Sequence, residues 1–96
     1  MRRTKTMLVG DLLEEFFSRP GIAAKVAEGK LPDTWRAIVG DRVAAMTSRL
    51  RLENHILYVH VTSSTVRSEL FLRRYALTAE INRLSGLRLV YDVRFR

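Results

Sequence analysis

The chain has 96 residues, 47% of them hydrophobic and 28% charged, which is the size and composition of one globular domain with a single modest core. It has no cysteine, which excludes a disulfide framework and any thiolate metal or nucleophile site. No apolar run reaches the roughly 18 residues of a membrane span, and no apolar export segment follows the basic N-terminus. We therefore expect a cytoplasmic protein that does not bind membranes.

The net charge of +7 is distributed unevenly along the chain. Residues 1–48 carry eight Lys and Arg against six acids, whereas residues 49–96 carry nine Arg, no Lys and four acids. Guanidinium groups fork onto phosphates and stack on bases better than ammonium groups do. This favours a polyanionic partner, above all nucleic acid. The alternative is a soluble arginine-rich protein, because net charge alone does not place the charges on one face.

The basic residues 1–7 are interpreted as a flexible N-terminus that precedes a single domain over residues 8–96. Leu8 to Ser18 predicts a first helix, because its apolar residues form two adjacent rows with acidic residues opposite. Arg19-Pro20-Gly21 ends this helix, since proline cannot continue the backbone hydrogen bonding. Ile22 to Glu28 predicts a short second helix.

A third helix begins at Leu31-Pro32-Asp33-Thr34, where proline and an acidic residue suit a helix N-terminus. Trp35 lies on its apolar side, and we interpret it as a core residue rather than as a platform for a stacked base. Gly40 interrupts the apolar pattern, which predicts either a bend or the close approach of another backbone.

Two alternating segments, Thr47 to Glu53 and Ile56 to Val61, predict a β-hairpin closed by a turn at Glu53-Asn54-His55. The period of two divides their side chains between the two faces of the sheet. The predicted inward set is Leu50, Leu52, Leu57, Val59 and Val61, and the predicted outward set is Arg49, Arg51, Ile56, Tyr58 and His60.

The Thr62–Thr65 cluster offers several helix N-caps, and a single long helix is predicted from Val66 to a left-handed C-cap at Gly86. Its core stripe is Val66, Leu70, Leu77, Ile81 and Leu84. Leu87 to Arg96 then predicts a last strand with Leu89, Tyr91, Val93 and Phe95 inward and Arg88, Val90, Asp92, Arg94 and Arg96 outward.

This order of elements predicts an α+β two-layer domain. A right-handed strand–helix–strand crossover should place the last strand parallel to its neighbour. The helices should then cover one face of a three-stranded sheet and leave the other face open.

Catalysis has little support in the sequence. His55 and His60 lie in extended structure without neighbouring acids, which matches neither a catalytic triad nor metal-ligand spacing. The glycines are isolated, so no phosphate-binding loop is present. We predict a protein that is not an enzyme and that uses no cofactor, metal or small-molecule substrate.

Two surfaces are candidates for binding. The open sheet face combines arginines with aromatic rings, which suits phosphates and unpaired bases, although a solvated outer face is common in antiparallel sheets. Its candidate nucleic-acid residues are Arg49, Arg51, Tyr58, His60, Arg94 and Arg96.

The second surface is the back of the long helix, where Phe71, Leu72, Tyr75, Ala76 and Ala79 lie nearly opposite the core stripe. Either the N-terminal helices pack on this side, which is the commoner arrangement, or a protein partner does. Its candidate partner-binding residues are Arg67, Phe71, Arg74 and Tyr75.

A series of short motifs resembles the DciA-like family, long described as a bacterial domain of unknown function, over residues 8–96, and is most similar to its short single-domain Bacteroidetes-like versions. The motifs are Trp35-Arg36-Ala37-Ile38-Val39-Gly40, Thr47, Leu57-Tyr58-Val59-His60-Val61, Ser63-Ser64, Arg67-Ser68-Glu69-Leu70, Ile81-Asn82 and Asp92-Val93-Arg94-Phe95-Arg96.

The resemblance implies a KH-like domain, associated with the nucleoid, that helps to recruit or load the DnaB-type replicative helicase and that binds single-stranded or forked DNA. The chain has no G-x-x-G, so the nucleotide clamp of KH domains proper is not carried over. The alternatives are an RNA-binding KH-like module and a protein–protein adaptor whose charge serves only solubility.

Overall fold

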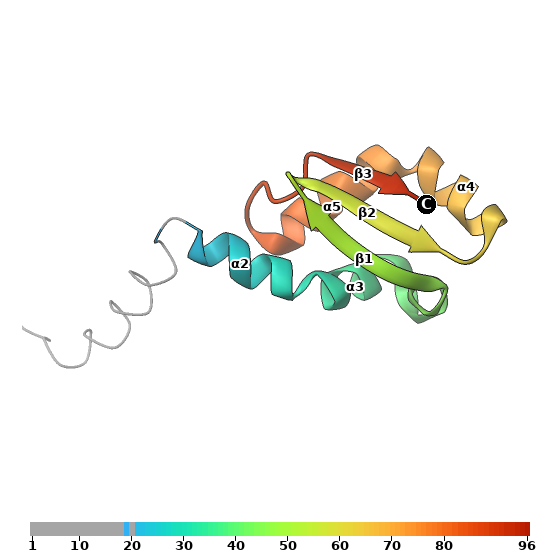
Figure 1. Ribbon diagram of the computed structural model, residues 1–96, viewed down its shortest axis with the longest axis horizontal. Coiled ribbons are helices and arrows are strands. Elements are labelled where there is room, and N and C mark those ends of the chain that lie inside the picture. Colours follow the sequence, from blue (N-terminus) through green and yellow to red (C-terminus); the bar gives the residue numbers. More distant parts are fainter. Residues whose placement is uncertain (1–18, 20) are drawn as a thin grey trace, which may run out of the picture.

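The computed structural model describes residue 19 and residues 21–96 (Figure 1). The predicted N-terminal segment 1–7 and the predicted helix from Leu8 to Ser18 lie outside the described residues. The elements in chain order are α2 (Ile22–Gly29), α3 (Leu31–Ala45), β1 (Thr47–Glu53), β2 (Ile56–Val61), α4 (Ser64–Leu72), α5 (Arg74–Ser85) and β3 (Asp92–Phe95).

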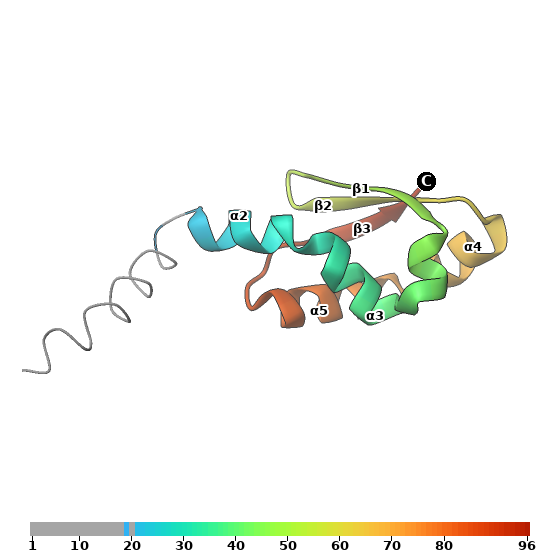
Figure 2. The ribbon, with the colours of Figure 1, turned by 90° about the horizontal axis from the view of Figure 1, so that it is seen from below.

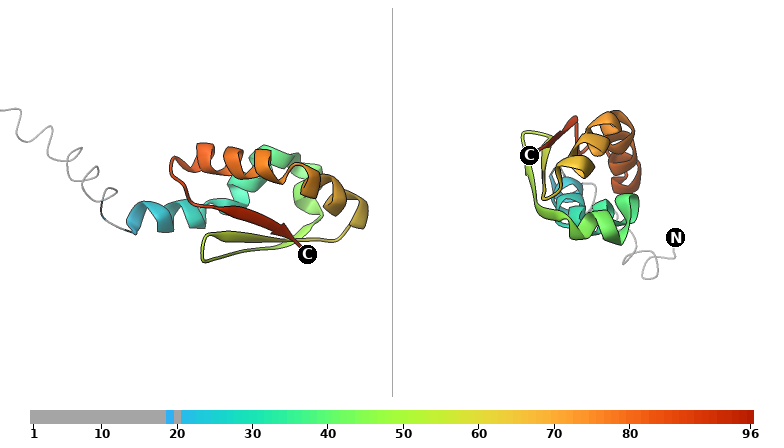
Figure 3. Two further views of the ribbon diagram at one scale, coloured as in Figure 1. Left: turned by 90° about the horizontal axis from the view of Figure 1, so that it is seen from above. Right: turned by 90° about the vertical axis from the view of Figure 1, so that its right-hand side faces the viewer.

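The three strands form one mixed sheet in the order β1-β2-β3. β1 pairs antiparallel with β2, and β2 pairs parallel with β3, so α4 and α5 form the crossover between the two parallel strands. The helices lie on one side of the sheet, as Figures 2 and 3 show. The predicted α+β two-layer architecture, with its parallel last strand, is confirmed.

The hairpin turn consists of Asn54 and His55, both of which have a positive φ, 50° and 65°. Two residues in this conformation form the tight turn whose twist matches that of the flanking strands. The turn joins Glu53 directly to its partner Ile56, so the turn fixes the register of the whole hairpin.

The core lies between the sheet and the helices. Leu57 and Val59 are fully buried and Val61 is nearly so, which confirms the predicted inward face of β2. Trp35 is only 2% exposed, as predicted for a core residue. Its indole Nε1 donates to Thr47 Oγ1 at 2.9 Å, so the polar atom of the buried ring is satisfied.

Gly40 bends α3. Its φ of 88° and ψ of 164° are far from helical values, and they lie in a region that L side chains rarely adopt. No atom lies within 4 Å of the place where a Cβ would stand, so the bend, and not a close backbone approach, accounts for this glycine.

The predicted single long helix is wrong, because the chain breaks at Arg73 (φ −101°, ψ 12°) into α4 and α5. The break lets α4 contact β2 and β3 while α5 contacts α3 and β3. Leu70, Leu77 and Ile81 are buried as predicted, but Leu84 is 45% exposed. Leu84 lies in the last turn of α5, beside α2 rather than under the sheet.

The last strand begins at Asp92 and not at Leu87, and two predicted orientations are wrong. Val90, predicted outward, is fully buried, whereas Tyr91, predicted inward, is 53% exposed. The cause is Asn82, whose amide donates to the carbonyl of Val90 at 2.8 Å and accepts from its N–H at 2.9 Å. This pair of bonds holds the segment before β3 out of the strand pattern.

Candidate functional site

The register of the sheet brings the six candidate nucleic-acid residues onto its open face. Arg51 of β1 stands opposite Tyr58 of β2, which stands opposite Arg94 of β3. The next row contains Arg49, His60 and Arg96, since Arg49 pairs with His60 and the backbone of Arg96 bonds to both neighbours of His60. We call these two rows the arginine face.

Tyr58 is the centre of the arginine face. The guanidinium carbon of Arg51 lies 4.7 Å from its ring centroid, and that of Arg96 lies 5.4 Å away. Exposed cation–π contacts of this kind contribute only about 0.5–1 kcal/mol each. A nucleobase that stacks on Tyr58 therefore displaces a guanidinium at small cost and leaves it free for a phosphate.

The arginine face carries a net positive charge. Glu53 binds Arg51 at 2.8 Å and Asp92 binds Arg94 at 3.4 Å, both in exposed ion pairs. Arg49 and Arg96 have no acidic partner among the described residues. Exposed ion pairs are weak, so a phosphate can compete for the two paired guanidiniums as well.

Two nitrogen atoms on this face are shielded from solvent but lack a hydrogen-bond partner among the described residues: Arg51 Nε and His60 Nε2. A shielded polar atom without a partner carries a desolvation penalty of about 1–3 kcal/mol. An anionic oxygen that reached them would relieve part of this penalty. Arg51 and His60 belong to adjacent rows of the face.

The candidate partner-binding surface is exposed in the described part of the chain. Phe71, Leu72 and Tyr75 are 50%, 78% and 73% exposed, respectively. The Arg74 guanidinium lies 4.0 Å from the Phe71 ring centroid and 4.6 Å from that of Tyr75. We call Phe71, Leu72, Arg74 and Tyr75 the α4–α5 patch. An apolar cluster with a guanidinium held among its rings is typical of protein-binding surfaces.

Arg67, the fourth candidate for partner binding, makes contacts within the domain. Its Nε donates to the carbonyl of Arg96 at 3.0 Å and its Nη2 to the carbonyl of Val61 at 2.9 Å. It thereby ties α4 to the ends of two strands. It also borders the α4–α5 patch, because it lines a shallow pocket of about 360 Å³ with Phe71 and Leu72.

On α5, Arg83 contributes little free positive charge, because Glu80 accepts two hydrogen bonds from it at 2.8 and 2.9 Å. The hydrogen bond from Arg83 lowers the pKa of the Glu80 carboxyl below its ordinary value. Both groups are exposed, and their charges neutralise each other at neutral pH. Arg83 is therefore not counted among the arginines available to a polyanion.

One aromatic cluster was missed by the sequence reasoning. The Tyr91 ring stacks on the His55 ring, with centroids 4.3 Å apart and planes 10° apart, and Arg88 lies over Tyr91 at 4.5 Å. His55 Nδ1 lies 3.2 Å from the carbonyl of Leu89 and therefore carries the proton. Periodicity could not reveal this stack, because it depends on the bonds that hold Val90 inward.

Within the described residues, no three side chains of the metal-binding types gather in one place. None of the helices that the structure describes is long and apolar enough to cross a membrane.

Comparisons with known proteins agree with the motif pattern. A family model described as "Dna[CI] antecedent, DciA" matches residues 8–95. Two curated relatives from Mycolicibacterium smegmatis, a "UPF0232 protein in recF-gyrB intergenic region" and a UPF0232 protein of strain ATCC 700084 / mc(2)155, are each 30% identical over 79 residues. Each alignment covers 82% of this chain and 41% of the relative, so the chain spans about two-fifths of their length. No solved structure matches.

Proposed function

Because the chain belongs to the DciA family, we propose that it is a non-enzymatic accessory factor of DNA replication that binds DNA and the DnaB-type replicative helicase. The family is associated with loading of this helicase, which supports the replication role. The DNA-binding part of the proposal rests on the arginine face, where Arg51 and Arg96 contact the Tyr58 ring. Among the described residues, Arg49 and Arg96 of this face have no acidic partner.

The arginine face fits single-stranded or forked DNA better than a closed duplex. Its guanidiniums can neutralise phosphates along a strand, and Tyr58 and His60 offer ring faces to unpaired bases. The sheet is too broad to enter a groove of duplex DNA, which admits a helix or a two-stranded ribbon. Unpaired bases are what a helicase-loading factor meets at an opened origin or fork.

We assign the helicase to the α4–α5 patch. The patch lies on the helical layer, whereas the strands carry the arginine face (Figure 3). Its side chains are exposed, and Arg74 lies against two aromatic rings, the residue types that are enriched in protein–protein interfaces.

The test is sedimentation velocity of this protein mixed with the DnaB-type helicase of its own organism, at low and at moderate salt. We expect a complex that Phe71→Ala with Tyr75→Ala weakens at least about tenfold, because exposed aromatic anchors dominate such interfaces. Tyr91→Ala is the matched control, since it removes an exposed aromatic ring outside the patch. The double variant should keep a cooperative thermal transition.

If the folded wild-type protein and the folded helicase form no complex, the helicase assignment is wrong. An RNA-binding module would then be the better description. Tighter binding to RNA than to DNA of equal sequence would support it, because the 2′-hydroxyl is the group that distinguishes them.

A further inference from the structure

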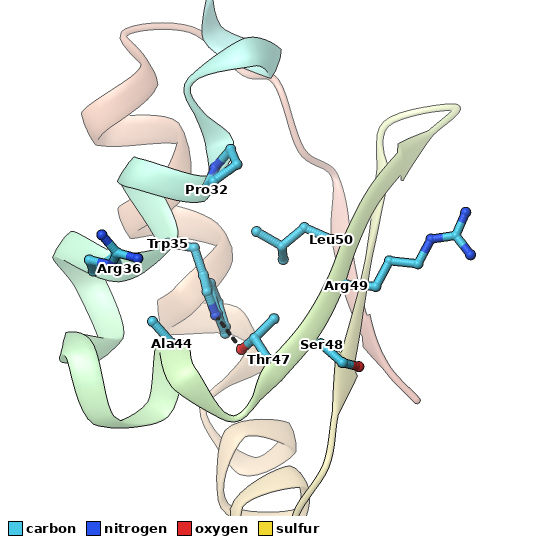
Figure 4. A pocket seen from close by; sticks show the side chains of 8 residues that line it. All are labelled: Pro32, Trp35, Arg36, Ala44, Thr47, Ser48, Arg49 and Leu50. Carbon is cyan, nitrogen blue, oxygen red and sulfur yellow. Dashed lines mark hydrogen bonds between the residues drawn. The ribbon is translucent and has the colours of Figure 1, made fainter.

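β1 is an edge strand, and a groove runs along its free edge. Two adjoining pockets of about 270 and 330 Å³ lie between this strand and the α2–α3 segment, and they share Pro32 and Leu50. We call them together the edge groove. Its lining follows β1 from Thr47 to Leu52 on one side and includes Leu31, Pro32, Trp35 and Arg36 on the other. Figure 4 shows the lining of the first of the two pockets.

Within the described part of the chain, backbone groups of β1 on the side of this groove have no hydrogen-bond partner. The C=O of Val59 and the N–H of Val61 point to β3, where they bond to the backbone of Arg96. Because backbone groups alternate along a strand, the N–H and C=O groups of Tyr58 and His60 point to β1. Their partners Arg51 and Arg49 therefore bond to β2.

By the same alternation, Leu50 and Leu52 direct their N–H and C=O groups outward. Among the described residues, no side chain bonds to the backbone of either leucine. An uncovered edge of this kind is a template for one more strand.

The groove walls suit alternate apolar side chains of an added strand. Figure 4 shows Leu50, Pro32 and Trp35 bordering the hollow, whereas the Arg49 side chain points away from it. Trp35 is almost fully buried, so the accessible apolar surface of the groove comes from Pro32, which is exposed, and from Leu50 and Leu52, which are half-buried. In strand addition, main-chain bonds supply affinity and pockets for every second side chain supply specificity.

The charges around the groove favour an acidic occupant. The lining contains three arginines and one acidic residue, Glu28: Arg49 and Arg51 rise from β1 on the open face, and Arg36 lies on the helical wall. Arg36 is exposed, and its ion pair with Asp41 is long at 3.6 Å. Antiparallel pairing with a second copy of the chain is disfavoured in the registers centred on Leu50 and on Arg51, because both place Arg51 opposite another arginine.

We propose that the edge groove binds an extended segment of a partner protein, with alternating apolar and acidic residues, as a fourth strand beside β1. The edge groove shares Arg49 and Arg51 with the arginine face and is separate from the α4–α5 patch. Because its main-chain bonds do not involve the arginine side chains, protection of the Leu50 and Leu52 amides can fail or hold independently of the proposed function.

The test uses ¹⁵N-labelled full-length protein and a capped peptide of about six residues with alternating Glu and Val, the usual length of a strand. In the free protein, we expect the amides of Arg49 and Arg51 to exchange slowly and those of Leu50 and Leu52 to exchange fast. Saturating peptide should slow exchange at Leu50 and Leu52 at least about tenfold, because new ladder bonds protect alternate residues.

The matched probe has Lys in place of Glu and should bind at least about tenfold more weakly, since it meets like charge. Arg36→Glu should weaken binding of the Glu–Val peptide about fivefold, whereas Arg42→Glu, an exposed change on the same helix outside the groove, should not.

Three outcomes would overturn the proposal. One is peptide binding that lacks either the expected charge preference or the expected protection of the Leu50 and Leu52 amides. Another is protection of these amides that grows with protein concentration without peptide, which would identify a second copy as the occupant. The third is the same alternate protection on addition of oligo(dT), which would assign the groove to nucleic acid.

Discussion

Arginine residues serve different ends in this molecule, depending on what surrounds each guanidinium. Arg67 bonds to two backbone carbonyls, and Arg74 lies against two aromatic rings. Arg83 is neutralised by Glu80, whereas Arg49 has no acidic partner among the described residues. The number of arginines therefore does not give the positive charge that is available to a polyanion. That charge depends on which guanidiniums already have partners within the domain.

At the level of single residues, we expect Arg49→Glu with Arg96→Glu to weaken binding of single-stranded DNA and to reduce its salt dependence. Each lost phosphate contact lowers the slope of log affinity against log salt by about 0.7, so the double variant should lower it by about 1.4. The measurement is fluorescence anisotropy of labelled oligo(dT) over a range of salt concentrations.

Lys25→Glu with Arg42→Glu is the matched control, because both side chains are exposed and the net charge changes equally. An equal loss of affinity and slope in the control would contradict the assignment of binding to the arginine face. The effect would then belong to the overall charge of the domain.

For Arg67, the structure and the sequence motif suggest different roles, and a substitution separates them. Arg67→Met should lower the free energy of unfolding by about 1–2 kcal/mol, because it removes two charge-assisted hydrogen bonds to carbonyls. Urea denaturation measures this loss, with Arg73→Met, an exposed arginine at the helix break, as the control. Unchanged stability together with weaker helicase binding would instead give Arg67 a role in the interface.

At the level of elements, most of the fold could be predicted from local sequence patterns. The short helix α2, the hairpin and the burial of β2 follow from hydrophobic periodicity and turn residues within a few positions of each other. The break at Arg73 could not be predicted this way, since no glycine or proline marks it. The segment before β3 depends on Asn82, whose side chain reaches the backbone of Val90 only in the folded state.

The bend in α3 gives a prediction at this level. Gly40→Ala should lower the melting temperature, with a loss of about 1–3 kcal/mol, because alanine is strained at the φ and ψ of this position. Gly29→Ala, at a glycine without positive φ and with open space around it, should leave stability unchanged or slightly higher. Equal effects of the two substitutions in thermal unfolding would mean that the bend is not required.

At the level of the whole molecule, the two layers separate the candidate surfaces. The arginine face lies on the side of the sheet away from the helices, and the α4–α5 patch lies on the helical layer (Figures 2 and 3). The sequence predicted the membership of the arginine face, because a period of two sorts side chains by face. It could not predict which arginines would be paired, since ion pairs and ring contacts depend on neighbours across the sheet.

The mixed sheet also has a kinetic consequence. β1 and β2 meet through a two-residue turn, whereas Leu57 of β2 meets Val93 of β3 only after α4 and α5 have closed the crossover. Closing a longer loop costs more chain entropy, so the hairpin should form before β3 docks. We expect Leu57→Ala to slow refolding and Val93→Ala mainly to speed unfolding, as stopped-flow measurements in urea would show. Slower refolding in both variants would mean that the transition state already contains the parallel pair.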